Sequence, residues 1–338
     1  MAGLLPVPRF EVALAPPNLR PWQAGNSGVA GFTTRDSGVA GPHAVVVSLL
    51  HGNEFAGAVV VERLLREGFW PERGRLTLGF ANLAAFWRFD AMEPTASRFL
   101  DEDLNRLWDA RLLDSPRRSR ELDRAREMRP LVETADALLD LHSMLWPSDP
   151  LLLCGMGARG RRLARAMGEP PLVVADRGHE AGPRLIDFGR FAGEGEAAAC
   201  LVEAGQHWVE QTVAMTERAV RGFLGALGMV PGRAAASVAV APATVPAVAG
   251  ATVPAVAGAT VPAVAEVTVA VTAATSEFAF LQPYRGGEVI ARRNTLIALD
   301  GEREIRTPHD DCLLVMPSLR PSRGHTAVRL ARFVEGIA

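Results

Sequence analysis

The sequence predicts an α/β protein with a sheet layered by helices, followed by a small C-terminal domain rich in strands. Residues 1–230 alternate short apolar runs with segments of helical periodicity, which is typical of strands and helices in one α/β sheet. An Ala/Pro/Val repeat then interrupts the alternation. Residues 267–338 contain short strand-like runs separated by Gly-Gly and Asp-Gly turns. We therefore expect a large domain at 1–230, a linker at 231–266 and a small β domain at 267–338.

Continuous apolar runs predict the strands of the large domain, because strands buried on both faces lose the polar alternation. The expected strands are AVVVSLL (44–50), RLTLGFAN (75–82), DALLDLH (136–142), PLLLCG (150–155), PLVVAD (171–176) and ACLVEAG (199–205). Helical spacing predicts helices in NEFAGAVVVERLLREG, SRELDRAREMRPLVETA and HWVEQTVAMTERAVRGFLGALG.

An octapeptide repeat separates the two domains. ATVPAVAG occupies residues 243–250 and again 251–258, and ATVPAVA follows at 259–265. A solenoid is one interpretation, because fixed periods are typical of that class. The period is too short for a helical unit, however, and the prolines remove backbone donors. We therefore expect a disordered, extended linker.

The composition excludes several classes of function. The formal net charge is −2 and the chain has one tyrosine, so neither a nucleic-acid-binding surface nor a base-stacking platform is indicated. No window offers about 18 uninterrupted apolar residues, which argues against a membrane span. Cys154, Cys200 and Cys312 form no C-x-x-C pair, and we expect three buried, reduced thiols. The N-terminus lacks the pattern of a signal peptide, so we expect a cytoplasmic location.

The stretch LLHGNEFAG places a histidine and a glutamate where a buried strand gives way to a helix. His51 ends the apolar run and Glu54 begins the helical pattern. Alone, this pair would be explained as an acidic residue near a helix N-terminus. His142, however, closes another strand, and α/β proteins bind ligands at the carboxyl ends of parallel strands. Two histidines and one carboxylate form a common catalytic zinc set, which leaves one position for water.

Polar side chains in SRFLDEDLNRLW offer further candidates. Asn105 and Arg106 are adjacent, and an arginine fork suits a carboxylate. The alternative is an ordinary helix start capped by Asp103. Arg98 is a candidate for polarising a carbonyl oxygen, and alone it would be taken for a surface arginine. Asp140, two residues before the strand-ending histidine, is a candidate partner for that ring or a solvated carboxylate.

The motifs HGNE, DLNR and DLHS occur in this order, and together they resemble the succinylglutamate desuccinylase/aspartoacylase family. This family is a branch of the zinc-carboxypeptidase-like hydrolases. The resemblance covers most of residues 25–230 and continues into the C-terminal β domain. It implies a zinc-carboxypeptidase-like mixed sheet flanked by helices. It also implies a zinc-dependent deacylase of amino-acid metabolism, which hydrolyses a small N-acyl amino acid to a carboxylate and a free amine.

The resemblance also implies the roles of individual residues. Its zinc (Zn2+) ligands fall on His51, Glu54 and His142, its substrate-carboxylate pair on Asn105 and Arg106, and its carbonyl-polarising arginine on Arg98. The family's general base is a glutamate in a Glu-x-Gly motif, which Glu180 and Glu203 both match. Glu180 lies in a loop-like context, whereas Glu203 ends an apolar run and precedes the closing helix. We therefore favour Glu203 as the base.

The sequence departs from the aspartoacylase pattern at two places. Aspartoacylases use a further arginine shortly before the catalytic glutamate, and here Arg184 and Arg190 are the candidates for binding substrate. They also use a tyrosine of the C-terminal domain. The single tyrosine, Tyr284, is not in the matching place, and His325 is an alternative. These departures leave the acyl group and the amino acid undetermined.

Two other functions remain open at this point. A metallocarboxypeptidase acting on peptides would use the same ligands and the same carboxylate pair. A non-catalytic zinc- or ligand-binding module is a different class, and the presence of a base candidate argues against it. A structural zinc site usually has four protein ligands, often cysteines, and no fourth ligand is evident. The expected partner is a small molecule rather than a nucleic acid or a membrane, and the sequence leaves a homo-oligomer open.

Overall fold

The computed structural model describes residues 10–230 and 262–334, and its central feature is one mixed sheet of 11 strands. The strand order is β1-β3-β2-β4-β7-β5-β6-β8-β14-β13-β10. Most of the predicted linker, including the first two octapeptides, lies outside the described residues. The predicted mixed α/β sheet with a small C-terminal β region is confirmed.

Four parallel strands form the part of the sheet that matters for the site. They are β2 (His43–Ser48), β3 (Arg75–Phe80), β4 (Ala137–Met144) and β7 (Ala198–Gln206). β1 (Phe32–Asp36) runs antiparallel to β3 at one edge, while β5 (Leu151–Cys154) runs antiparallel to β7 and parallel to β6 (Leu172–Ala175). Every residue of β2 and β4 is buried, which explains why both strands are continuous apolar runs in the sequence.

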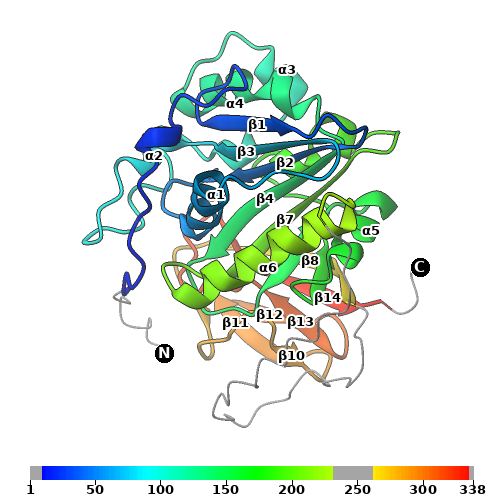
Figure 1. Cartoon of the computed structure of the whole chain (residues 1–338). Helices are drawn as coiled ribbons and strands as arrows, with labels where there is room; N and C mark the ends of the chain where they lie inside the picture. The colour runs from blue at the N-terminus through cyan, green and yellow to red at the C-terminus, as the bar shows by residue number, and fades with distance from the viewer. Residues whose placement is uncertain (1–9, 231–261, 335–338) are drawn as a thin grey trace.

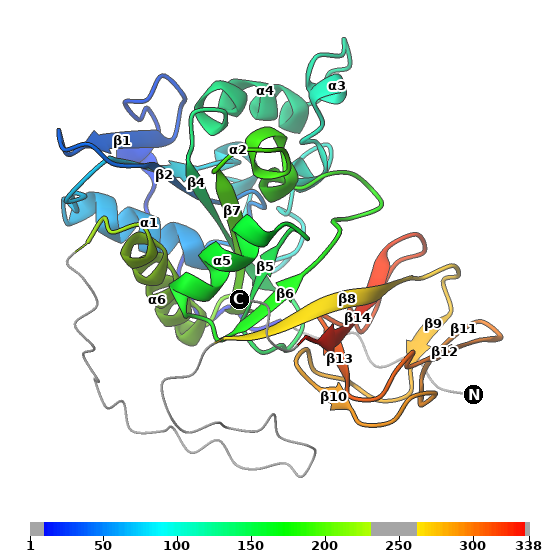
Figure 2. The same ribbon diagram turned by 90° about the vertical axis from the view of Figure 1, so that its right-hand side faces the viewer.

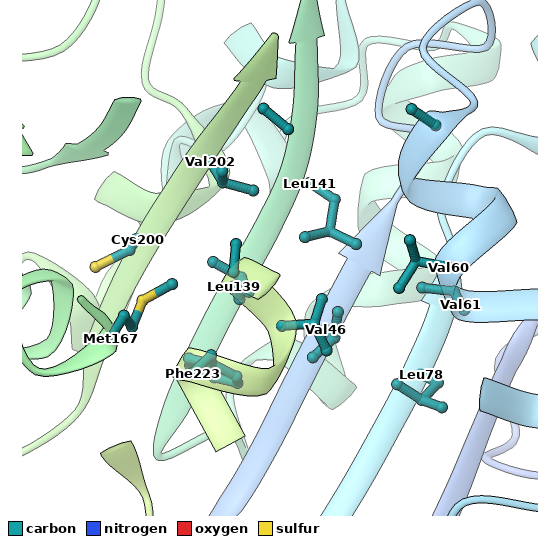
Figure 3. Close-up of a cluster of buried hydrophobic side chains, with 14 of the residues drawn as sticks. Val46, Val60, Val61, Leu78, Leu139, Leu141, Met167, Cys200, Val202 and Phe223 are labelled. Carbon is teal, nitrogen blue, oxygen red and sulfur yellow. The ribbon is translucent and has the colours of Figure 1, made fainter. Parts of the chain in front are cut away.

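Helices cover both faces of these strands (Figure 1). One face carries α1 (Ala56–Arg66), α5 (Ala158–Met167) and α6 (Glu210–Ala226), and the other carries α4 (Arg120–Val132). Figure 3 shows the first face, where side chains of the central strands gather against Val60, Val61 and Phe223. Alternate residues of β2 pack on opposite faces: Val46 belongs to this core and Val45 to the other.

Shorter helical segments complete the large domain. They are α2 (Leu83–Phe86), α3 (Ala110–Leu113), η1 (Arg20–Trp22), η2 (Leu104–Arg106), η3 (Leu185–Asp187) and η4 (Gly189–Phe191). The start of α4 has a clear local cause. The Ser119 side chain accepts a hydrogen bond from the Leu122 amide, and Glu121 and Asp123 lie in the first turn. In the described residues, none of the helices combines the length and apolar character that a membrane crossing requires.

The C-terminal region continues the same sheet (Figure 2). β8 (Ala263–Thr272) pairs in parallel with β6, and β14 (Thr326–Phe333), β13 (Cys312–Val315) and β10 (Val289–Ile290) follow it. A second sheet joins β9 (Phe278–Phe280), β11 (Leu296–Asp300) and β12 (Arg303–Arg306). The expected domain boundary at 267 falls inside β8, whose first residues were assigned to the linker. All three cysteines are free and buried, as predicted.

Candidate active site

His51, Glu54 and His142 lie together at the carboxyl end of the parallel strands. Glu54 Oε1 is 2.8 Å from His51 Nδ1, and Glu54 Oε2 is 3.0 Å from His142 Nδ1. One potential ligand atom from each of the three residues lies within 4.8 Å of the other two, and all three residues are buried. The group forms because β2 and β4 are neighbouring parallel strands, so the residues at their carboxyl ends meet at one edge of the sheet.

A tight turn after β2 presents two of these side chains. The Glu54 amide donates to the His51 carbonyl at 3.2 Å, and the Gly52 amide donates to the Arg98 carbonyl at 3.0 Å. A Cβ atom on Gly52 would lie 2.5 Å from the backbone of Ala85, so only glycine fits. The turn thus sets the spacing of the His-Gly-Asn-Glu motif and brings Arg98 to it.

Both histidines contact a second carboxylate through their other ring nitrogen. His51 Nε2 is 2.9 Å from Asp103 Oδ1, and His142 Nε2 is 2.9 Å from Asp140 Oδ2. With a metal ion bound, a proton on each Nε2 would point at these carboxylates, and each Nδ1 lone pair would face the ion beside Glu54. This carboxylate–histidine arrangement is typical of metal-ligating histidines.

A further observation indicates that this group of side chains can bind a metal ion. The buried Nδ1 atom of His51 lies 2.8 Å from Glu54 Oε1 but makes no hydrogen bond of normal geometry among the described residues, which leaves its lone pair for a cation. Burial alone would raise the pKa of Glu54, but the two histidines lower it well below its usual range. Burial would lower the pKa of His142, but Asp140 and Glu54 raise it well above its usual range. Metal binding to this group would therefore release protons.

Glu203 is the glutamate beside this group. It lies in β7 directly opposite His142 in the ladder between β4 and β7. Its side chain is buried, its Oε2 atom has no hydrogen-bond partner among the described residues, and burial raises its pKa to about 8. Glu180, the alternative, is exposed on a loop, where its Oε2 accepts a 3.4 Å hydrogen bond from Thr272. The geometry therefore favours Glu203, as the sequence did.

Arg98 contacts the metal-ligand candidates directly. Its Nη1 donates to Glu54 Oε1 at 2.8 Å, and its Nη2 lies 2.9 Å from His51 Nε2 and 3.3 Å from Asp103 Oδ2. The Arg98 side chain is 37% exposed to solvent, so it lies at the solvent edge of the buried group. This position suits a cation that stabilises negative charge next to the ligands.

Asn105 and Arg106 lie on η2, close to the same group. The Asn105 side-chain oxygen accepts a 2.8 Å hydrogen bond from the Leu185 amide, and its nitrogen lies 3.4 Å from His142 Nε2. Arg106 donates to the Asn105 carbonyl, and burial lowers the pKa of Arg106 to about 10. An anion beside Arg106 would offset this desolvation cost.

The two further arginines predicted to bind substrate are placed differently. Arg184 is buried and already paired, with Asp187 at 2.7 Å and Asp176 at 3.3 Å, so its charge is neutralised inside the protein. Arg190 pairs with Asp136, which directly precedes β4. Arg190 therefore lies at the amino end of the strand whose carboxyl end carries the site. The structure does not bring Arg190 to the site, which corrects this expectation.

Three site neighbours were not given their roles by the sequence. Asp103 was noted only as a helix cap, although it also contacts His51 and Arg98. Its position inside the DLNR motif was the available signal. Arg329 of β14 reaches the large domain, with its Nε 2.8 Å from Asp176. Trp208 lies after β7 and contacts the turn after β2. The sequence holds no signal for the last two, because tertiary packing alone brings them there.

Two buried histidines lie on either side of the Glu54 carboxylate, and Glu203 lies opposite His142 on the neighbouring strand. This arrangement is typical of the centre of a metal-dependent hydrolase. Residues 40–224 match the model of the succinylglutamate desuccinylase/aspartoacylase catalytic domain. The match spans more than half of the chain, and the protein therefore belongs to this family of metal-dependent deacylases.

Solved structures share the fold at low sequence identity. The chain is similar to succinylglutamate desuccinylases of Vibrio parahaemolyticus (TM-score 0.62, 16% identity, 92% of this chain and 90% of that chain) and Vibrio cholerae (TM-score 0.65, 16% identity, 90% and 86%). It is also similar to a product-bound ectoine utilization protein of Ruegeria pomeroyi (TM-score 0.58, 16% identity, 89% and 88%). At this identity the likeness shows the fold alone. No curated protein matches the sequence.

Proposed function

We propose that the protein is a zinc-dependent amidohydrolase that cleaves an N-acyl amino acid to a carboxylate and a free amino acid. The observation that carries this proposal is the position of Glu203 opposite His142, beside the His51–Glu54–His142 group, in a chain of a deacylase family. A purely ligand-binding zinc module would not need a buried carboxylate without a hydrogen-bond partner next to its ligands.

His51, Glu54 and His142 would hold the zinc ion through two imidazole nitrogens and a carboxylate. A zinc ion in such a site polarises a carbonyl group and lowers the pKa of a water molecule. Asp103 and Asp140 orient the two imidazole rings through the Nε2 atoms. The two histidine rings are 4.9 Å apart with an interplanar angle of 69°, which lets both Nδ1 atoms face the carboxylate between them.

Glu203 acts as the general base in this proposal. Its carboxylate takes a proton from the attacking water and later delivers it to the nitrogen of the leaving amine. The raised pKa of Glu203 strengthens it as a base, because burial disfavours the charged form. The water attacks the carbonyl carbon, and the C–N bond breaks as the amine nitrogen receives the proton.

Arg98 and the pair on η2 orient the substrate. Arg98, at the solvent edge of the ligand group, stabilises the negative charge that develops on the carbonyl oxygen. Arg106 and the adjacent Asn105 bind the α-carboxylate of the substrate. Holding both ends of the amide reduces the entropic cost of reaching the reactive geometry.

A substrate panel tests this function. The zinc-loaded protein is incubated with acetyl-, succinyl- and longer acyl-amino acids, and with peptides, while release of free amine is measured. We expect turnover of one class of N-acyl amino acid and little turnover of peptides. Preferential release of C-terminal amino acids from peptides would instead identify a metallocarboxypeptidase. No turnover in either class by the zinc-loaded protein would contradict a hydrolase.

The carboxylate pair gives a separate prediction. Converting the substrate's α-carboxylate to its neutral amide removes the anion that Arg106 binds, and a buried charge left unpaired is strongly unfavourable. We expect the amide to have a kcat/KM at least about 100-fold lower, which corresponds to about 3 kcal/mol. Equal kcat/KM values for the acid and its amide would rule out the carboxylate pair.

A further inference from the structure

A bulky residue with left-handed backbone lies just after the strand that carries Glu203. Trp208 has φ 60° and only 2% of its surface exposed. This conformation disfavours large side chains, and where it persists the surrounding structure must enforce it. Leu49, just before His51, also has φ 60°. Two such residues therefore lie near the proposed centre, one just after β2 and one just after β7.

The Trp208 side chain reaches the turn that holds two of the ligand candidates. Its indole Nε1 donates a 2.8 Å hydrogen bond to the carbonyl oxygen of Asn53. That carbonyl and the Glu54 amide belong to one rigid, planar peptide group. The other edge of this plane is also fixed, because the Glu54 amide donates to the His51 carbonyl. The indole thus sets the orientation of the peptide from which the Glu54 side chain starts.

The residue before Trp208 makes a parallel connection to the segment that ends β4. The His207 amide donates to the Met144 carbonyl at 2.8 Å, and His207 Nδ1 lies 2.7 Å from Ser143 Oγ. The Ser143 amide in turn donates to Glu54 Oε2 at 3.1 Å. Glu54 is therefore held from both sides by contacts that begin at the end of β7.

We propose that Trp208 is a positioning residue that fixes the Asn53–Glu54 peptide through its indole N–H, and so sets the geometry of the metal ligands. This inference rests on the proposed zinc centre. Rings of Phe10 and Phe89 pack at 6.2 and 6.1 Å from the Trp208 ring and restrict its rotation. Trp208 thus combines a left-handed backbone with a ring that reaches the turn after β2.

The test separates the hydrogen bond from general packing. Trp208→Phe keeps an aromatic ring and removes the donor. Trp108→Phe is the matched control, because Trp108 is equally buried and its Nε1 has no hydrogen-bond partner among the described residues. The zinc dissociation constant of each variant is measured by competition with a chromogenic chelator, which requires no turnover. We expect Trp208→Phe to bind zinc about 10- to 100-fold more weakly, as for other groups that orient metal ligands, and Trp108→Phe to bind like the parent.

Two results would overturn the inference: parental zinc affinity in Trp208→Phe, or an equal loss in Trp108→Phe, which would show general loosening of the core. If Trp208→Phe does not fold, benzothienylalanine at position 208 replaces the N–H with sulfur and keeps the shape of the ring. The same loss of zinc affinity is expected. A parent protein that binds no zinc would instead contradict the proposed metal centre itself, so the two failures are distinguishable.

Discussion

Glu203→Gln is expected to lower kcat by roughly 100- to 10,000-fold, the usual contribution of a general acid–base group. The amide keeps the size and burial of the side chain but cannot take the water's proton. Zinc content and KM should change little, because Glu203 is not among the three ligand candidates. Steady-state kinetics and elemental analysis of the same preparation measure all three quantities.

The control for this variant is Glu180→Gln, because Glu180 carries the same Glu-x-Gly motif on an exposed loop. We expect near-parental kcat for this control. A pH profile adds a second check: the base works as a carboxylate, so the parent's kcat/KM should fall as pH drops through the pKa of Glu203. Glu203→Gln should lack this acidic limb. An inactive Glu180→Gln together with an active Glu203→Gln would reverse the assignment.

His142→Ala should lose both zinc and activity. Removing one of three ligands leaves His51 and Glu54, and two protein ligands hold zinc poorly. We expect zinc content to fall from about one ion per chain to near zero, and activity to fall with it. Elemental analysis after dialysis measures the first effect, and amine release measures the second.

His43→Ala is the matched control for the loss of a buried histidine. His43 begins β2, contacts Thr77 through its ring at 2.8 Å, and lies at the strand end opposite the site. Its removal should lower the melting temperature and leave zinc content unchanged. If His142→Ala retains a full complement of zinc, the proposed ligand set is incorrect.

The sequence was most informative where local pattern and burial agree. Runs such as the one ending at His51 predicted strands that the structure confirms, because strands buried on both faces must be apolar throughout. The same patterns predicted the positions of His51 and His142 at strand ends. Strand periodicity also indicated Asp140 as a partner for the His142 ring, because residues two apart in a strand share a face. The contact of Asp103 with His51 depends on side-chain directions, which periodicity does not specify.

Other features follow only from tertiary contacts. Helix α5 is rich in arginine, and it was not predicted, since its apolar face is narrow. β8 begins within the last repeat unit, because pairing with β6 gives a strand-compatible Ala/Val sequence the partner that it lacks alone. The family resemblance made Arg190 a candidate because an arginine is expected shortly before the catalytic glutamate, and the direction of the chain after β6 places it at the opposite edge.

The continuity of the 11-stranded sheet constrains how a reactant reaches the centre. The first residues of β8, Ala263 to Glu266, pair with β6 along its length, so the C-terminal region is joined to the large domain by a backbone ladder as well as by side-chain contacts. Swinging one region away from the other would break this ladder and expose two unpaired strand edges. A reactant could enter and leave without breaking this ladder by rearrangement of surface loops and side chains alone.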